Sequence, residues 1–443
     1  MDQNLLHDVV AAALKAGAEA AEAVAAERQS LSVNVRLGDL EEVEREEARD
    51  LGVRVFIGHK QASVSGSDIS AEGRAKLVER VINMARMAAE DPYAGLAPQD
   101  RLAKGPFPDL ELYDAAEPSA ADLEERARAA EDAARAVRGV TNSDGGSASW
   151  STSQVCMVTS GGFVGHHRAS GFSLYASAIA GDERGMERGG DGRSTRWQTD
   201  LPAPEAIGAE AGRRAVQRLG ARKIDSQTAA VIFENRSAMS LISPLLGAVS
   251  GPSIARGASF LKTKLGQPVF GPAINIVDQP HRVRGLGSSP FDDEGVANAP
   301  TRLIDKGVLT TWLLNTASAK QLGLETTGHA SRGLAGPPGV GVSNLTVEPG
   351  ELDLAGLMGA ARQGLLVTSM FGPSLNANTG DWSTGVSGFW FQDGQIAFPV
   401  NEITVAGNLV DLYARVIAGS DLELRGSHNS PSLMVEDMAI AGR

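Results

Sequence analysis

Hydrophobic and polar residues follow two different periods in the first part of the chain. Apolar residues between positions 5 and 14 recur at helical spacing, which predicts an amphipathic helix that ends near Gly17. Over residues 23–37 the apolar positions alternate roughly by two, a pattern typical of a half-buried strand. Residues 51–68 continue this alternation on both sides of Gly58, which predicts two strands joined by a tight turn.

Helical periodicity returns in three further segments of the N-terminal half, at residues 72–91, 117–137 and 204–221. Ser119 stands where the second of these helices would need an N-cap. Strand patterns occupy much of the range 140–190. Because strands are joined by hairpins as often as by helices, the pattern favours an α+β fold over a doubly wound parallel sheet.

The composition shifts after about residue 225 toward glycine, proline, serine and short apolar runs. Short strands separated by turn signals predict a mainly β half, either a barrel or a sandwich. Helices are predicted there at about residues 236–250, 315–322, 351–362 and 408–418. We therefore expect a mixed α/β N-terminal domain and a mainly β C-terminal domain, over residues 1–225 and 226–443, with 1–92 and 117–225 as candidate sub-parts of the first.

Composition and charge narrow the class of protein. The chain has 443 residues and a net charge of −13, which argues against direct binding of nucleic acid. No apolar run approaches the roughly 18 to 20 residues that a membrane-spanning helix needs. The N-terminal helix contains His7, Asp8 and Lys15 and does not resemble a secretory signal. A single cysteine, Cys156, excludes an intramolecular disulfide, so we expect a cytoplasmic protein.

The residues by themselves offer no recognisable catalytic constellation. No two of the seven histidines have the i, i+4 spacing of a helical zinc site, and a metal role for His166-His167 competes with a surface or packing role. The carboxylates Asp292, Asp293 and Glu294 could hold a cation, but an acidic turn is the simpler interpretation. Cys156 lies in an apolar strand pattern, which favours a buried thiol over a nucleophile.

An acidic run at residues 41–50, EEVEREEARD, is most simply interpreted as a solvated strand face or loop. Three long motifs then indicate a family. Residues 41–58, EEVEREEARDLGVRVFIG, residues 289–330, which begin SPFDDEGV, and residues 379–409, which begin TGDWSTGVSGFWF, resemble the TldD/PmbA family in the same order along the chain. The resemblance covers nearly the whole sequence.

That resemblance implies a heterodimeric protease with two kinds of subunit. In the TldD branch an HExxxH helix and a cysteine near the C-terminus bind the catalytic metal, whereas the PmbA branch, also called TldE, lacks these ligands. The register set by residues 256–270 places the two histidines and the glutamate at or near Ser243, Pro244 and Ala248, and the cysteine near Ser430. These side chains cannot ligate zinc, so the chain resembles the PmbA/TldE branch.

The resemblance therefore implies a cytosolic, non-catalytic subunit with no cofactor of its own, paired with a TldD-type protein that carries a metal, expected to be zinc. It further implies peptide substrates, with roles such as microcin maturation. The label "modulator of DNA gyrase" used in the family is indirect. We expect the former metal helix to persist as packing, with Pro244 in its first turn, where a missing N–H is tolerated.

The glycine-bounded aromatic strand at residues 384–394 is a candidate for contact with a peptide or a partner subunit, because a strand edge can bind an extended chain. The candidate contact residues are Gly388, Phe389, Trp390 and Phe391. Core packing of Phe389 and Phe391 is the competing interpretation, and Trp390, on the opposite face of the strand, is the better contact candidate.

Two other functions stay open. One is a homodimeric peptide-binding or scaffold protein without protease activity, a state that could also form when the chain is alone. The other is an independent hydrolase that uses the carboxylates near Asp292.

Overall fold

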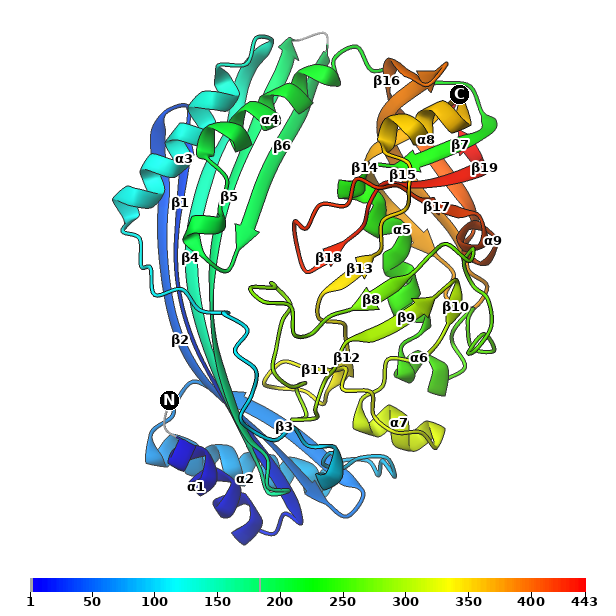
Figure 1. Cartoon of the computed structure of the whole chain (residues 1–443). Coiled ribbons are helices and arrows are strands. Elements are labelled where there is room, and N and C mark those ends of the chain that lie inside the picture. Colours follow the sequence, from blue (N-terminus) through cyan, green and yellow to red (C-terminus); the bar gives the residue numbers. More distant parts are fainter. Residues whose placement is uncertain (1–2, 183–184) are drawn as a thin grey trace.

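The N-terminal half is built on one long, curled antiparallel sheet (Figure 1). The structure is a computed structural model that describes residues 3–182 and 185–443, so residues 183 and 184 of the predicted strand region lie outside the described residues. The strand order is β3-β2-β1-β4-β5-β6. The strands are β1 (Ala20–Arg36), β2 (Asp39–Ile57), β3 (Lys60–Gly66), β4 (Val140–Thr159), β5 (Val164–Asp182) and β6 (Gly185–Thr195).

Helices cover one face of this sheet at its two ends (Figure 1). They are α1 (Gln3–Lys15), α2 (Ala71–Met87), α3 (Ala120–Arg135) and α4 (Pro204–Gln217). Alternate residues of β1 point to this face, so Ala23 and Ala25 pack under α1 and α2, whereas Val33 and Val35 pack under α3 and α4. The long sheet therefore has two separate apolar cores on the same side.

The C-terminal half contains a closed barrel in which β16-β15-β14-β7-β19 follow one another and β16 pairs back to β19. Its strands are β7 (Gln227–Phe233), β14 (Gln363–Leu375), β15 (Asp381–Gln392), β16 (Gln395–Asn408) and β19 (Leu433–Ala441), with β17 (Val416–Ala418) added beside β19. A second sheet has the order β10-β9-β8-β13-β18: β8 (Ile276–Asp278), β9 (Thr301–Asp305), β10 (Val308–Leu309), β13 (Leu345–Val347) and β18 (His428–Asn429). A small pair joins β11 (Ala330–Ser331) and β12 (Gly339–Val340).

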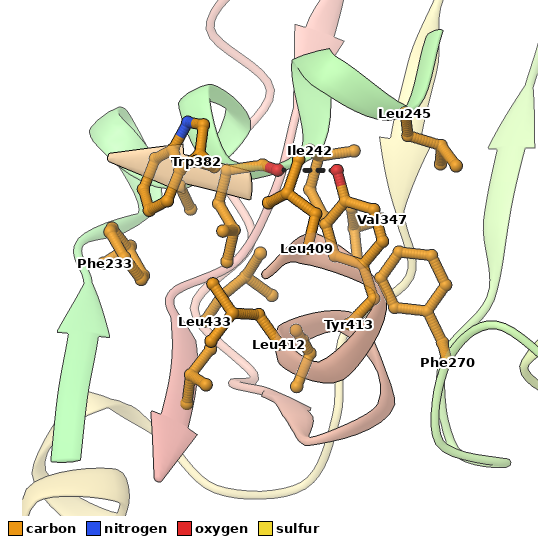
Figure 2. Close-up of a cluster of buried hydrophobic side chains, with 14 of the residues drawn as sticks. Phe233, Ile242, Leu245, Phe270, Val347, Trp382, Leu409, Leu412, Tyr413 and Leu433 are labelled. Atoms are coloured by element: carbon orange, nitrogen blue, oxygen red, sulfur yellow. Dashed lines mark hydrogen bonds between the residues drawn. The ribbon is translucent and has the colours of Figure 1, made fainter. Parts of the chain in front are cut away.

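The largest apolar core fills this barrel and extends from it to the second sheet, and Figure 2 shows part of this core. In this core the rings of Phe270 and Tyr413 stack with centroids 4.6 Å apart, and Phe233 meets Trp382 edge-on. Helices of this half are α5 (Asn235–Ala248), α6 (Gly251–Ala255), α7 (Thr316–Leu322), α8 (Leu354–Ala361) and α9 (Leu409–Ala414). Of these, α5 contributes its apolar face to the core.

The predicted α+β class is confirmed, and the mainly β half is a barrel with an accompanying sheet. The bounds of the C-terminal helices differ from the prediction at two places. Helix α6 was not predicted because five residues are too few to show a helical period. The predicted helix at 408–418 ends at Ala414, since Val416–Ala418 pairs with β19 as a strand. Among the described residues, no helix combines the length and apolar character needed to cross a membrane.

Candidate functional site

Helix α5 holds the three positions that the sequence register assigns to a metal helix. Its apolar face is buried, and Ala248, 5 % exposed, belongs to that face. Ser243 points to solvent and its hydroxyl donates to the Met239 carbonyl oxygen at 2.8 Å, a bond within the helix itself. Pro244 is half-buried. The three side chains offer one hydroxyl and no imidazole, carboxylate or thiolate.

The prediction that Pro244 lies in the first turn of this helix is wrong. Helix α5 begins at Asn235, so Pro244 lies in its interior. A proline in the interior lacks the N–H that would bond to the carbonyl of residue i−4, here Ser240. The helix persists because its buried residues pack into the barrel core, which outweighs the lost bond.

Ser430, the position assigned to a cysteine, lies just after β18 and is 1 % exposed. Its hydroxyl donates to the carbonyl oxygen of Pro431 at 2.8 Å, so the group is used within its own turn. Strand β18 contacts α5, which brings this turn and the helix to the same region of the C-terminal half (Figure 1). Within residues 3–182 and 185–443, no three His, Cys, Asp or Glu side chains are placed to hold a metal ion.

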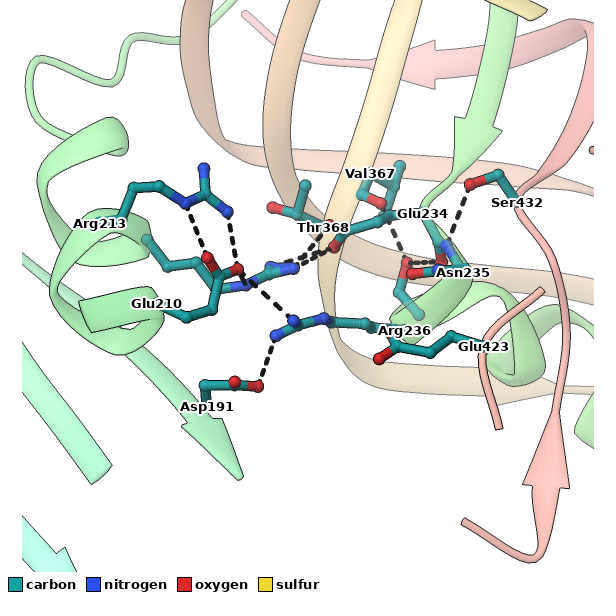
Figure 3. Close-up of polar contacts among 12 residues, drawn as sticks. Asp191, Glu210, Arg213, Glu234, Asn235, Arg236, Val367, Thr368, Glu423 and Ser432 are labelled. Atoms are coloured by element: carbon teal, nitrogen blue, oxygen red, sulfur yellow. Dashed lines mark hydrogen bonds and ion pairs between the residues drawn. The ribbon is translucent and has the colours of Figure 1, made fainter. Parts of the chain in front are cut away.

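The start of α5 is tied to the N-terminal half by a group of charged residues that we call the junction cluster, part of which is drawn in Figure 3. Its members are Asp191, Arg193, Glu210, Arg213, Arg214, Glu234, Arg236, Glu423 and Arg425. Arg214 of α4 donates to both carboxylate oxygens of Glu234, the residue before α5, at 2.5 and 3.1 Å. Arg236 of α5 pairs with Asp191 of β6 at 2.7 Å.

Sequence reasoning missed the junction cluster. Asp191, Glu234 and Arg425 are far apart in the chain and follow no motif, so no sequence signal joins them. Their proximity follows only from the way the curled sheet meets the barrel. The cluster orients the start of α5 through the ion pairs of Glu234 and Arg236, and Asn235 adds a bond from its N–H to the Ser432 hydroxyl.

The aromatic strand β15 divides its side chains between two cores. Phe391 is fully buried with Ile232 and Met434, and Phe389 packs partly buried against the same group. Trp390 points to the opposite face, into the barrel core, and is 8 % exposed. Trp390 is among the residues that line a surface hollow, but with 8 % of its surface exposed the area that it offers to a partner is small.

Gly388 is required by close packing of two strands, because a Cβ there would lie 1.9 Å from the Leu366 carbonyl oxygen of β14. A contact role for this strand remains a prediction.

The acidic turn at Asp292–Glu294 uses its oxygens to hold neighbouring loops. Asp292 accepts bonds from the N–H groups of Glu294, Val296 and Ala330 at 3.0, 2.8 and 3.0 Å. Glu294 accepts from the N–H and hydroxyl of Thr316 at 2.8 and 2.6 Å. Burial, followed by the charge of Glu294, raises the pKa of Asp292 to about 7. These bonds account for the turn as a structural element.

The remaining candidates are Cys156 and the pair His166-His167. Their surroundings are those of packing residues. Cys156 is 2 % exposed, and burial raises the pKa of its thiol, which makes a reactive thiolate costly. His166 is exposed, whereas His167 lies edge-on to Phe291 with ring centroids 5.8 Å apart. Burial, with smaller contributions from Arg196 and His166, lowers the pKa of His167 to about 4. The two imidazoles therefore lie in different environments.

Comparison with known families shows the family to which this chain belongs. The PmbA/TldA metallopeptidase C-terminal domain matches residues 226–442, the central domain 113–219, and domain 1 residues 21–85. The chain belongs to the PmbA/TldD family. Metalloprotease PmbA of Escherichia coli is 35 % identical over 100 % of this chain and 97 % of that protein. The Metalloprotease PmbA homolog of Haemophilus influenzae is 36 % identical over 97 % and 94 %.

Two solved structures share the fold of this chain. A protein from Bacteroides thetaiotaomicron described as a modulator of DNA gyrase superposes with a TM-score of 0.92 at 28 % identity, covering 100 % of this chain and 99 % of that one. TldE from Thermococcus kodakarensis superposes with a TM-score of 0.86 at 20 % identity over 98 % and 99 %, and shows the shared fold. The predicted resemblance, including the PmbA branch, is confirmed.

Proposed function

We propose that this chain is the non-catalytic, PmbA/TldE-type subunit of a heterodimeric metallopeptidase whose metal, expected to be zinc, is carried by a TldD-type partner. The observation that supports this most is the chemistry of α5, where Ser243, Pro244 and Ala248 stand in the register of the metal helix. Zinc in proteins is bound by imidazole, thiolate or carboxylate groups, and none of these three residues has one. The residues of this chain do not fit the metal that the family name implies.

The chemistry of Ser430 supports the same proposal. A hydroxyl is a much poorer zinc ligand than a cysteine thiolate, and this hydroxyl is already engaged by the Pro431 carbonyl oxygen. With α5 anchored by the barrel core and by the junction cluster, the helix acts in this chain as a packing element. The proposed work of the subunit is to complete the heterodimer in the cytoplasm and to help it hold peptides and unfolded segments.

The test is reconstitution with a TldD-type protein from the same genome. The two purified chains are mixed, passed over a sizing column, and assayed with an unstructured peptide alone and together. We expect co-elution, cleavage by the mixture, and no cleavage by this chain alone. Elution as a homodimer that binds peptide and ignores the partner would favour a scaffold instead. Peptide cleavage by this chain alone, abolished by a chelator, would overturn the non-catalytic assignment.

A further inference from the structure

Part of strand β2 has an edge with no neighbour. Strand β2 pairs with β1 along its length except for a bulge at Glu41, but β3 pairs only with Leu51–Ile57. Residues 39–50 therefore have β1 alone as their ladder partner. Figure 1 shows β2 at the outer margin of the sheet. An unpaired strand edge presents a row of free N–H and C=O groups that another extended chain can bind.

The side chains along this edge differ between the two faces of the sheet. Opposite Asn34, Ser32 and Ser30 of β1, the residues of β2 are Glu42, Glu44 and Glu46, and all three carboxylates are exposed on one face. Among the described residues, Glu44 and Glu46 have no hydrogen-bond or ion-pair partner. An extended chain beside β2 would thus meet a carboxylate at every second position.

The other face of the edge carries the aliphatic Leu40 and Val43 beside the charged Arg45, Glu47 and Arg49. Val43 lies opposite Val33, which is buried under α3, yet Val43 itself is 47 % exposed because α3 does not reach the edge strand. Leu40 is exposed to a similar degree. A chain added beside β2 would cover these two aliphatic side chains and gain their burial.

A hollow of about 280 Å³ lies where β3 leaves the edge, beside α1 and the residues that precede α2. Its lining is mostly apolar and includes Leu5, Ala25, Leu51 and Ile69. The ion pair of Arg49 with Glu27 stands at its rim. The volume suits one large aliphatic or aromatic side chain, and side-chain pockets beside a free edge give strand addition its specificity.

We propose that the free edge of β2 binds a basic, extended segment of another polypeptide as an added strand. Lysine or arginine residues at alternate positions of that segment face Glu42, Glu44 and Glu46, and one large apolar side chain enters the hollow. Residues 39–50 carry seven carboxylates and two guanidinium groups, so a second copy of this chain would bring like charges together at the edge. The inference is independent of whether the chain pairs with a TldD-type protein.

The test uses a short fluorescent peptide that alternates lysine with threonine and carries one leucine near its end. Its binding to the full chain is measured by fluorescence anisotropy at low and at high salt. We expect salt-sensitive binding that the variant E42Q/E44Q/E46Q weakens about tenfold, because three exposed ion pairs are lost. The control variant E79Q/E125Q/E351Q, which removes the same charge from exposed sites elsewhere, should change binding by less than about twofold.

Two modified peptides separate strand addition from simple charge attraction. N-methylation at alternate residues keeps the charge but removes the N–H donors that face the edge, and it should weaken binding at least about tenfold. Replacing the leucine by alanine should weaken binding several-fold. Equal binding of the methylated peptide, or equal weakening by the control variant, would overturn the proposal. A dimer of this chain that blocks the peptide would assign the edge to a second copy and overturn it as well.

Discussion

The hydroxyl of Tyr413 in α9 donates to the carbonyl oxygen of Leu241 in α5 at 3.0 Å, in the centre of the barrel core (Figure 2). Tyr413 is fully buried, and burial raises the pKa of its phenol, so the group is a neutral donor. This bond joins α5 to the element that follows β16. It explains how a helix without metal ligands is still held in one place.

We expect Tyr413→Phe to lower the free energy of unfolding by about 1 kcal/mol, because the ring packing is kept and one buried hydrogen bond is lost. Urea denaturation followed by circular dichroism measures the change. Tyr93→Phe, at a half-buried tyrosine in the segment between the helices of the N-terminal half, serves as the control and should change stability by much less. Equal effects of the two substitutions would contradict a specific role for the bond.

Restoring the missing ligands tests the register on which the proposed function depends. We expect the variant Ser243→His, Pro244→Glu, Ala248→His, Ser430→Cys to bind more zinc than the wild-type chain, since two imidazoles and a thiolate are zinc ligands and the register gives the glutamate the role of general base. Elemental analysis after dialysis gives the metal content. The same variant without Ser430→Cys should bind zinc more weakly. A folded quadruple variant with no more zinc than the wild-type protein would show that the register is wrong.

The junction cluster predicts different costs for two neighbouring arginines of α4. Arg214 is 11 % exposed and bonds to both oxygens of Glu234, so Arg214→Met should lower the free energy of unfolding by about 2 kcal/mol by leaving that carboxylate without its main partner. Arg213 is 50 % exposed, and Arg213→Met should cost less than about 1 kcal/mol despite its pair with Glu210. Thermal and urea unfolding compare the two. A larger loss for Arg213→Met would contradict this ranking.

Asp292 predicts a dependence of stability on pH. Its pKa in the folded protein is raised to about 7 by burial and then by Glu294, compared with about 3.9 in an unfolded chain. The folded state therefore binds this proton more tightly, and the stabilisation is complete below about pH 4 and is lost as the pH rises through about 7.

We expect Asp292→Asn to flatten the fall in unfolding free energy between about pH 4 and 7, whatever its effect on absolute stability. Urea titrations at a series of pH values measure the slope. Asp305→Asn, an aspartate at the end of β9, is the control and should leave the slope unchanged. An unchanged slope in Asp292→Asn would mean that the three N–H donors keep this carboxyl ionised.

The elements that the sequence determined are those whose buried face repeats over many residues. Helices α1 to α4 and the hairpin between residues 51 and 66 were predicted close to their observed positions, because a helix or strand with one apolar face shows its period directly in the sequence. Strand β2 begins earlier than this hairpin, at Asp39. The sequence also shows directly that the assigned positions of α5 have no metal-ligating side chains. Whether a position holds histidine, serine or alanine is a property of the sequence alone, so the absence of metal ligands at Ser243 and Ala248 needed only the register.

Tertiary structure alone decided which distant residues meet. The pairing of Arg214 with Glu234, the choice of a barrel over a sandwich, and the interior place of Pro244 depend on packing between segments far apart in the chain. The acidic run of β2 shows the division most clearly. Its exposure followed from its charge, but only the point at which β3 leaves the sheet determined that residues 39–50 keep an unpaired edge, because hydrogen bonding between strands is a relation between segments and not a property of either one.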